Sequence, residues 1–207
     1  MIFVFTDCGS KNTEEIVFVT HSCSKNTLEQ IFGSFLPPLT ANHTVLDVGS
    51  RLGAVLYGAH VFSEAGKILG IEVNKELCDL QNHVIGKFGL SGRVSVIHGE
   101  MTTRPDLFEL ADVVILNNVF EWFVETAHQI SMWQFLSRNI KVGALIVTMP
   151  SLEKSTSGLP LGMSLQNWVR PYSSRTSDLM SIADSNQDVD INLYQVINKC
   201  AFPSPLS

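Results

Sequence analysis

The sequence has few charged residues and no concentration of positive charge. Aspartate, glutamate, lysine and arginine make up 16% of the 207 residues, and the formal net charge is -6. The 14 lysines and arginines are scattered along the chain. Surfaces that bind DNA or RNA depend on clustered lysine and arginine, so we expect no direct nucleic-acid binding. An acidic chain is compatible with a cationic partner.

The sequence also lacks a long apolar run. No stretch reaches the roughly 18 consecutive apolar residues that a membrane-spanning helix needs. The first residues, MIFVFTDCG, contain no basic segment and reach Asp7 early, so no signal peptide is expected. We therefore expect no attachment to a membrane.

Cysteine is scarce, and its spacing is uninformative for metal binding. No two cysteines form a C-x-x-C pair, and no histidine lies at ligand spacing from one. The cysteines are Cys8, Cys23, Cys78 and Cys200. The pattern predicts reduced thiols, no metal site, and a cytoplasmic or nuclear location.

What the chain does have is a regular alternation of strand-like and helix-like segments. Hydrophobic residues make up 45% of the chain, and a chain of this length suits one compact domain. The expected strands cover residues 44–48, 67–73, 93–99, 112–118 and 143–149. The expected helices cover residues 53–64, 75–88, 105–110 and 124–140. Strands that alternate with helices predict right-handed crossovers and a mostly parallel α/β sheet.

The segments on either side of this pattern are less regular. Residues 2–5 and 16–20 are β-branched and aromatic runs that predict a small hairpin. Thr27 and Gln30 form a capping-box pattern, which predicts a short helix beginning at Thr27.

After the alternating segments we expect a loop at residues 151–163, a helix near 176–183 and a final strand within 189–198. We therefore divide the chain into an amino-terminal extension or substrate lid, a ligand-binding core, and a carboxy-terminal part of the same domain. These three parts cover residues 1–43, 44–150 and 151–207.

A glycine turn, GSRLG at residues 49–53, follows the first of the regular strands. Ligands of open parallel sheets bind at the carboxyl ends of the strands, and glycine lets the backbone approach a ligand closely. Glu72 ends the second strand, where a carboxylate can accept hydrogen bonds from ribose hydroxyls. The triphosphate pattern G-x-x-x-x-G-K-[ST] and the dinucleotide pattern G-x-G-x-x-G are both absent. S-adenosylmethionine, which has no phosphate groups, is the adenosine-like ligand that fits best.

Five segments resemble the motifs of class I S-adenosylmethionine-dependent methyltransferases, in the family's order and spacing. They are VLDVGSRLGAVLYGA (45–59), ILGIEVNKELCDL (68–80), VSVIHGEM (94–101), ADVVILNNVFEWF (111–123) and VGALIVTMP (142–150). The resemblance extends over residues 28–150. It implies a Rossmann-like, doubly wound, mostly parallel seven-stranded sheet flanked by helices. It also implies an enzyme that converts S-adenosylmethionine to S-adenosylhomocysteine.

The same resemblance implies where the cofactor binds. The glycine turn would hold the amino-acid half, Glu72 the ribose, and Glu100 with Met101 the adenine. The implied cofactor-binding residues are Asp47, Gly49, Ser50, Gly53, Glu72, Val73, Glu100, Met101 and Asn117. Arg51 takes the place of the family's usual middle glycine. A positive φ at that position would strain the backbone by about 1–2 kcal/mol.

The fourth motif bears on the methyl acceptor. Its N-N-x-F pattern resembles the "disruptor of telomeric silencing" family of histone-lysine methyltransferases, which implies Asn117, Asn118 and Phe120 as catalytic residues. Asparagine carbonyls can accept the N–H groups of a neutral lysine amine. The rings of Phe120, Trp122 and Phe123 could line an apolar channel. Alternatively, Asn118 caps the next helix and the aromatic residues only pack in the core.

We therefore expect N-methylation of a protein side chain, with a lysine-like amine as the acceptor. The chain has no basic stretch of the kind that nucleosome-binding members carry, so a nucleosome is not the expected substrate. Two other hypotheses remain open. One is a non-catalytic methyltransferase-like interaction domain, because Arg51 departs from the motif. The other is a small-molecule methyltransferase, whose lid would be the amino-terminal hairpin and residues 151–175.

Overall fold

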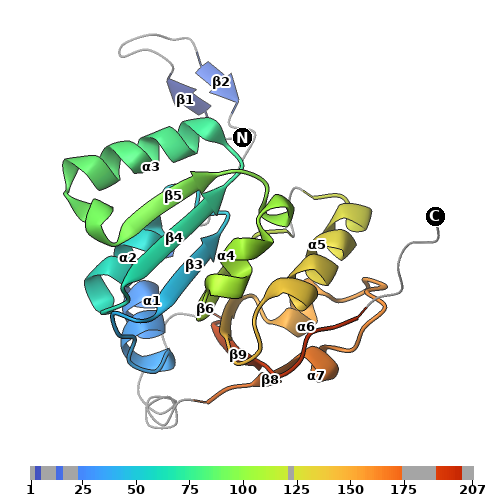
Figure 1. The fold of residues 1–207 in the computed structure, drawn as a ribbon. Coiled ribbons are helices and arrows are strands. Elements are labelled where there is room, and N and C mark those ends of the chain that lie inside the picture. Colours follow the sequence, from blue (N-terminus) through green and yellow to red (C-terminus); the bar gives the residue numbers. More distant parts are fainter. Residues whose placement is uncertain (1–2, 6–12, 16–22, 121–123, 174–189, 202–207) are drawn as a thin grey trace.

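The protein folds around a central sheet with helices on both faces (Figure 1). The structure is a computed structural model that describes residues 3–5, 13–15, 23–120, 124–173 and 190–201. Within these residues the expected α/β architecture is confirmed, including the seven-stranded, mostly parallel sheet.

The strands of the large sheet lie in the order β5-β4-β3-β6-β7-β9-β8. The five parallel strands are β3 (Thr44–Val48), β4 (Lys67–Glu72), β5 (Val94–His98), β6 (Val113–Asn117) and β7 (Leu145–Met149). β9 (Asn192–Val196) runs antiparallel between β7 and β8 (Val169–Pro171). The chain order reverses between β3 and β6, so the ligand-binding switch point of a doubly wound sheet lies at their carboxyl ends.

The longer helices agree with the expected ranges to within about two residues. They are α2 (Ala54–Phe62), α3 (Lys75–Lys87), α4 (Pro105–Leu110) and α5 (Thr126–Asn139). Among the shorter ones, α1 (Lys25–Gln30) continues as the π-helix η1 (Ile31–Phe35). The others are the 3₁₀ turns η2 (Leu90–Gly92) and η3 (Met101–Thr103) and the helices α6 (Leu152–Ser155) and α7 (Leu165–Trp168). In the described part of the chain, none of these helices has the length and apolar character needed to cross a bilayer.

Two hydrophobic clusters pack on the two faces of the sheet, because successive side chains of a strand point in opposite directions. Leu46 of β3 packs with Trp133 of α5, on the face that α4 and α5 cover. Val45 packs with Ile31 and Leu56, on the face that the first three helices cover. β6 is buried at its first four positions and β7 at all five, as the continuously apolar runs VVIL and LIV predict.

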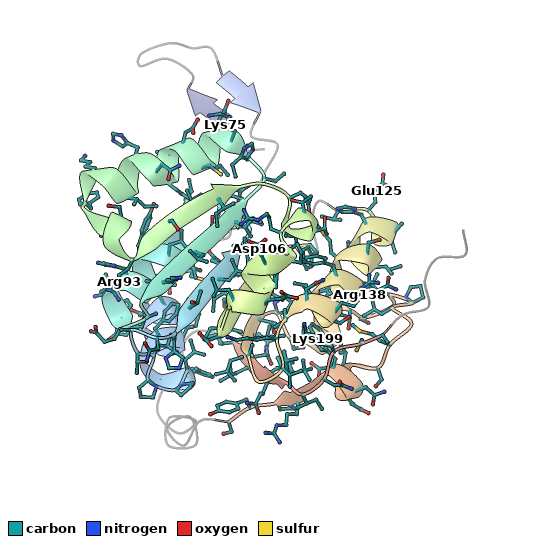
Figure 2. The ribbon with its side chains drawn as sticks, in the orientation of Figure 1. Lys75, Arg93, Asp106, Glu125, Arg138 and Lys199 are labelled. Carbon is teal, nitrogen blue, oxygen red and sulfur yellow. The ribbon has the colours of Figure 1, made fainter. Side chains whose placement is uncertain are left out.

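Arg93, labelled in Figure 2, ties the start of β5 to the end of α2. Its guanidinium donates hydrogen bonds to the carbonyl oxygens of His60 (2.7 Å), Ser63 (3.1 Å) and Ala65 (3.0 Å). The last carbonyl groups of a helix have no partner within the helix. The arginine therefore satisfies this helix end and holds β5 in register at the edge of the sheet.

The first helix begins three residues before the expected position. The N-cap of α1 is Ser24, whose Oγ accepts a hydrogen bond from the backbone N–H of Thr27 at 3.1 Å. The expected cap, Thr27, is buried inside the helix, and its hydroxyl shares a 2.8 Å hydrogen bond with that of Ser24. The expected start at Thr27 is therefore wrong, because Ser24 offers an equivalent hydroxyl one turn earlier.

We predict that Ser24→Ala lowers the free energy of unfolding by about 1 kcal/mol, because the N–H of Thr27 loses its acceptor. Urea denaturation followed by circular dichroism measures the change. Ser24→Asp, which restores a capping acceptor, should keep the wild-type stability. Equal losses in both variants would contradict a capping role.

Three other local expectations differ from the structure. The hairpin is present as β1 (Phe3–Phe5) paired antiparallel with β2 (Thr13–Glu15), so its second strand precedes the expected residues 16–20, which lie outside the described ones. The helix expected near 176–183 also lies outside them. Within the expected loop 151–163, Leu152–Ser155 form α6.

The short strand β8 was not expected at all. It is three residues long and ends in Pro171, at the edge of the sheet. A run this short cannot show the alternation that identifies a strand, and proline is accepted at an edge because no neighbouring strand needs its N–H.

Candidate functional site

The turn between β3 and α2 has a left-handed backbone at three of its five residues. The φ angles are 68° at Gly49, 49° at Arg51 and 80° at Gly53. Gly49 donates its N–H to the carbonyl of Ile71 at 2.8 Å, and Gly53 donates to the carbonyl of Ser50 at 2.7 Å. The turn is thus anchored on β4, directly beside the residue where that strand ends.

The glycine at position 53 is required for a second reason. A Cβ atom there would lie 2.7 Å from the ring of Tyr57, which packs under the turn. Arg51 also has a positive φ, although it is not a glycine. A left-handed backbone is strained for a residue with a side chain, so the backbone strain expected for a positive φ at this position is present.

Glu72 is held rigidly at the end of β4. Its side chain is buried, one carboxylate oxygen accepts the N–H of Arg51 at 2.9 Å, and the other accepts the N–H of Asn74 at 2.8 Å. Each carboxylate oxygen has two lone pairs, so both can accept a further hydrogen bond. The carboxylate is therefore positioned by the backbone and still able to bind a pair of hydroxyls.

A cavity of about 390 Å³ opens at the carboxyl ends of β3, β4 and β5. Gly49 lines it from the turn after β3, Glu72 and Val73 from the end of β4, and Glu100 with Met101 from the segment after β5. Its size is within the range of small-molecule sites, roughly 300–1,000 Å³. Five of the residues implied as cofactor contacts therefore line one cavity.

Glu100 lines this cavity and carries an unsatisfied carboxylate oxygen. Its Oε1 is buried and has no hydrogen-bond partner among the described residues. A buried acceptor without a donor is unfavourable by about 1–3 kcal/mol. If the side chain turns this oxygen toward the cavity, a ligand N–H group there, such as an exocyclic amine, would remove the penalty.

A second, much smaller cavity lies on the other side of the turn. Its volume is about 20 Å³, which is room for about one water molecule. Asp47, Ser50 and Asn117 line it, together with Cys23. The implied cofactor contacts are thus divided between two cavities, and Gly53 lines neither of them.

Asp47 and Cys23 are both shifted toward their neutral forms. Burial raises the pKa of Asp47 well above its usual value, the negative charge of Glu72 raises it further, and the positive charge of Arg51 partly opposes the shift. Burial, with a smaller contribution from Asp47, raises the pKa of Cys23 to about 12. Cys23 is therefore a thiol at neutral pH, which excludes it as a thiolate nucleophile.

The two asparagines of the fourth motif lie where β6 ends: Asn117 is the last residue of the strand, and Asn118 begins the turn that follows. The side-chain N–H of Asn117 donates to Sγ of Cys23 at 3.2 Å, and its Oδ1 accepts from the amide of Asn118 at 3.1 Å. Asn118 has a φ of 48° and donates its backbone N–H to the carbonyl of Met149 at 2.8 Å. It does not cap α5, whose N-cap is Glu125.

Phe120 forms a wall of the larger cavity rather than an exposed surface. Only 1% of it is exposed, and its ring packs edge-on against Trp133 with 5.1 Å between the ring centroids. Phe120 therefore packs in the core, which was the alternative to lining an apolar substrate channel. Trp122 and Phe123 lie outside the described residues.

The chain is similar to known methyltransferases in sequence and in fold. No protein-family model matches the chain. A plant protein named "Probable caffeoyl-CoA O-methyltransferase", from Arabidopsis thaliana, is 26% identical over 167 residues, which are 79% of this chain and 70% of the plant protein.

Two solved structures resemble the chain over most of its length. An RNA methyltransferase from Salinibacter ruber, crystallised with S-adenosyl-L-homocysteine, has a TM-score of 0.53 and 15% identity, covering 88% of this chain and 95% of its own. Geranyl diphosphate C-methyltransferase from Streptomyces coelicolor A3(2) has a TM-score of 0.53 and 14% identity, covering 85% and 81%. The chain has the class I methyltransferase fold. The finer resemblance to the "disruptor of telomeric silencing" family stays a prediction.

In this methyltransferase fold, α5 and the residues just before it complete the larger cavity with side chains that the sequence did not single out. Val124 lines it from just before the helix, and His128 and Met132 line it from α5. Their spacing of four places them on one face of a helix. The same spacing is typical of ordinary core packing, so nothing in the sequence marked them as lining a site. No cluster of histidine, cysteine and carboxylate side chains suited to a metal ion occurs in the described part of the chain.

Proposed function

We propose that the protein is an S-adenosylmethionine-dependent methyltransferase. The observation that carries this proposal is the placement of the glycine turn, Glu72 and Glu100 at three neighbouring strand ends around one cavity. The residues present fit the cofactor. Glu72 offers two positioned acceptors for the ribose hydroxyls, and the unsatisfied Oε1 of Glu100 suits the amino group of adenine. The methyltransferase fold and the similarity to the plant enzyme support the same reading.

When bound, S-adenosylmethionine supplies an electrophilic methyl group on a sulfonium sulfur. The protein then has to align an acceptor with that group and keep water away, and it needs no strongly basic side chain for this. The apolar wall of Val119, Phe120 and Met132 excludes water from the larger cavity. Asn117, beside the smaller cavity, is fixed by its bonds to Cys23 and Asn118.

For the acceptor, we propose an amine of the lysine type on another protein. An amide oxygen can accept N–H groups, and Oδ1 of Asn117 already accepts one from Asn118, so an amine N–H is a chemically matched donor for it; accepting that N–H would aim the nitrogen lone pair of the amine. The net charge of -6 favours approach of a cationic side chain.

A small-molecule acceptor is the second candidate, and the 26% identity to a protein named as a caffeoyl-CoA O-methyltransferase favours it. RNA is a third possibility to test, because one structural neighbour is named as an RNA methyltransferase. The expectation of no nucleic-acid binding stays a prediction.

Two measurements test these proposals in order. Isothermal titration of the folded protein with S-adenosylmethionine tests the activity class, and no measurable binding would favour the non-catalytic domain instead. Transfer of a labelled methyl group is then measured separately to protein extract, to RNA and to a metabolite fraction. Label in protein lysine supports the amine proposal, and label only in RNA or metabolites contradicts it.

We predict that Asn117→Ala lowers turnover by about tenfold while changing cofactor affinity by less than about twofold, because an acceptor hydrogen bond of about 1–1.5 kcal/mol is lost only toward the amine. Cys23→Ala, which removes a partner of Asn117 without touching its carbonyl, is the matched control. Equal losses of turnover and affinity in Asn117→Ala would mean that the residue is structural.

A further inference from the structure

The larger cavity has a histidine in its wall to which the proposed function gives no role. His128 lies in the first turn of α5, is exposed, and shares one helix face with Met132, which also lines the cavity. The backbone N–H of His128 donates to the carbonyl of Glu125, but its imidazole has no hydrogen-bond partner among the residues that the structure describes. Both ring nitrogens are therefore open to a ligand.

The other donors of this cavity gather around Glu72. Of the described side chains that line it, the remaining hydrogen-bond donors are those of Arg51 and Asn74, and the backbone N–H of each is bound to the Glu72 carboxylate. Glu72 is the acceptor proposed for the ribose hydroxyls, so these two residues lie at the ribose end of the cavity. His128 is the donor that α5 contributes.

An adenine base needs hydrogen-bond donors as well as acceptors. It has one amino group, which donates, and three ring nitrogens, N1, N3 and N7, which accept. The carboxylates of Glu72 and Glu100 can only accept hydrogen bonds while they are ionised. An imidazole has one N–H to donate when it is neutral and two when it is protonated. His128 thus supplies the kind of group that the carboxylates lack.

Resting on the proposed function, we infer that His128 recognises the base of the cofactor by donating a hydrogen bond to one ring nitrogen of adenine. The base is expected beside Glu100 and Met101, and Met101 belongs to the same hydrophobic cluster as Met132 of α5. The imidazole extends from the helix face of Met132, about one turn earlier. The wall that α5 gives the cavity therefore carries a donor on the side of the base.

The test is a cycle that removes the donor from the protein and the acceptor from the ligand. Dissociation constants of S-adenosylhomocysteine and of its 1-deaza, 3-deaza and 7-deaza analogues are measured by isothermal titration in the wild type and in His128→Leu. Each analogue replaces one ring nitrogen with a C–H group. The four ligands share the same ribose and amino-acid half, so effects of the substitution on these parts cancel in the ratio of the constants.

We expect His128→Leu to weaken binding of S-adenosylhomocysteine by about three- to tenfold, as for the loss of one hydrogen bond. One of the three analogues should bind the wild type and the variant equally, because its missing nitrogen is the one that His128 contacts. His128→Gln keeps a side-chain N–H and should retain most of the affinity. Ser131→Ala is the matched control and should bind like the wild type, because Ser131 is exposed on α5 and does not line the cavity.

Two results would overturn the inference and leave the proposed function intact. One is an equal loss in His128→Leu for S-adenosylhomocysteine and for all three analogues, which would mean that the residue acts without contacting a ring nitrogen. The other is an unchanged affinity for all four ligands. Failure of S-adenosylhomocysteine to bind the folded wild type would instead remove the proposed function, and the inference with it.

Discussion

Replacing Glu72 with glutamine is expected to weaken binding of S-adenosylmethionine by about 1.5–3 kcal/mol, or roughly ten- to a hundredfold. The carboxylate accepts two backbone N–H groups, from Arg51 and Asn74, and both oxygens have a lone pair left for the ribose. Glutamine offers one acceptor oxygen and turns its NH₂ group toward one of these N–H groups. The variant therefore loses a charged acceptor and also loosens the glycine turn.

Isothermal titration measures this effect, at a temperature well below the thermal transition of either protein. Glu76→Gln is the matched control, because Glu76 is exposed in the first turn of α3 and does not line the cavity. The control should bind like the wild type. Wild-type affinity in Glu72→Gln would show that the carboxylate does not contact the ligand.

Replacing Phe120 with alanine is expected to lower the free energy of unfolding by roughly 3–5 kcal/mol, the range for removing a buried phenylalanine ring. The ring is 1% exposed and packs edge-on against Trp133 in the cluster that joins α5 to the sheet. Its removal leaves a space between the helix and the larger cavity. Urea denaturation measures the loss.

Phe88→Ala is the control for this substitution, because the ring of Phe88 is 65% exposed. Its effect on the free energy of unfolding should stay within about 0.5 kcal/mol. Phe120→Leu then separates packing from catalysis, since leucine refills much of the space. If this variant keeps its stability and loses its turnover, Phe120 acts on the substrate and not only as a wall.

The sheet could be predicted from the sequence because its strands are buried on both faces. β6 and β7 contain the continuously apolar runs VVIL and LIV, and their ends were predicted to within two residues. The start of α1 could not be predicted with the same certainty. Ser24 and Thr27 both offer a capping hydroxyl, and the choice between them depends on which of the two is buried in the folded protein, which is Thr27.

The meeting of two carboxylates at the strand ends could be predicted from the local sequence pattern. The division of the site into two cavities could not. Glu72 and Glu100 follow parallel strands, so their side chains had to meet at one edge of the sheet. The path of the Arg51 side chain depends on a carbonyl 67 residues away in the sequence, and the contact of Cys23 with Asn117 joins residues 94 apart. Contacts of this kind form only when the chain is folded, so no motif records them.

The position of β9 has a consequence for the order in which the protein is completed during synthesis. β8 is made before β9 but pairs only with it, and β9 in turn covers β7. Until residues 192–196 have left the ribosome, the apolar strand Leu145–Met149 remains an open edge that another nascent chain can pair with. Of the described strands, β9 is made last, and it is the one that covers this edge against aggregation.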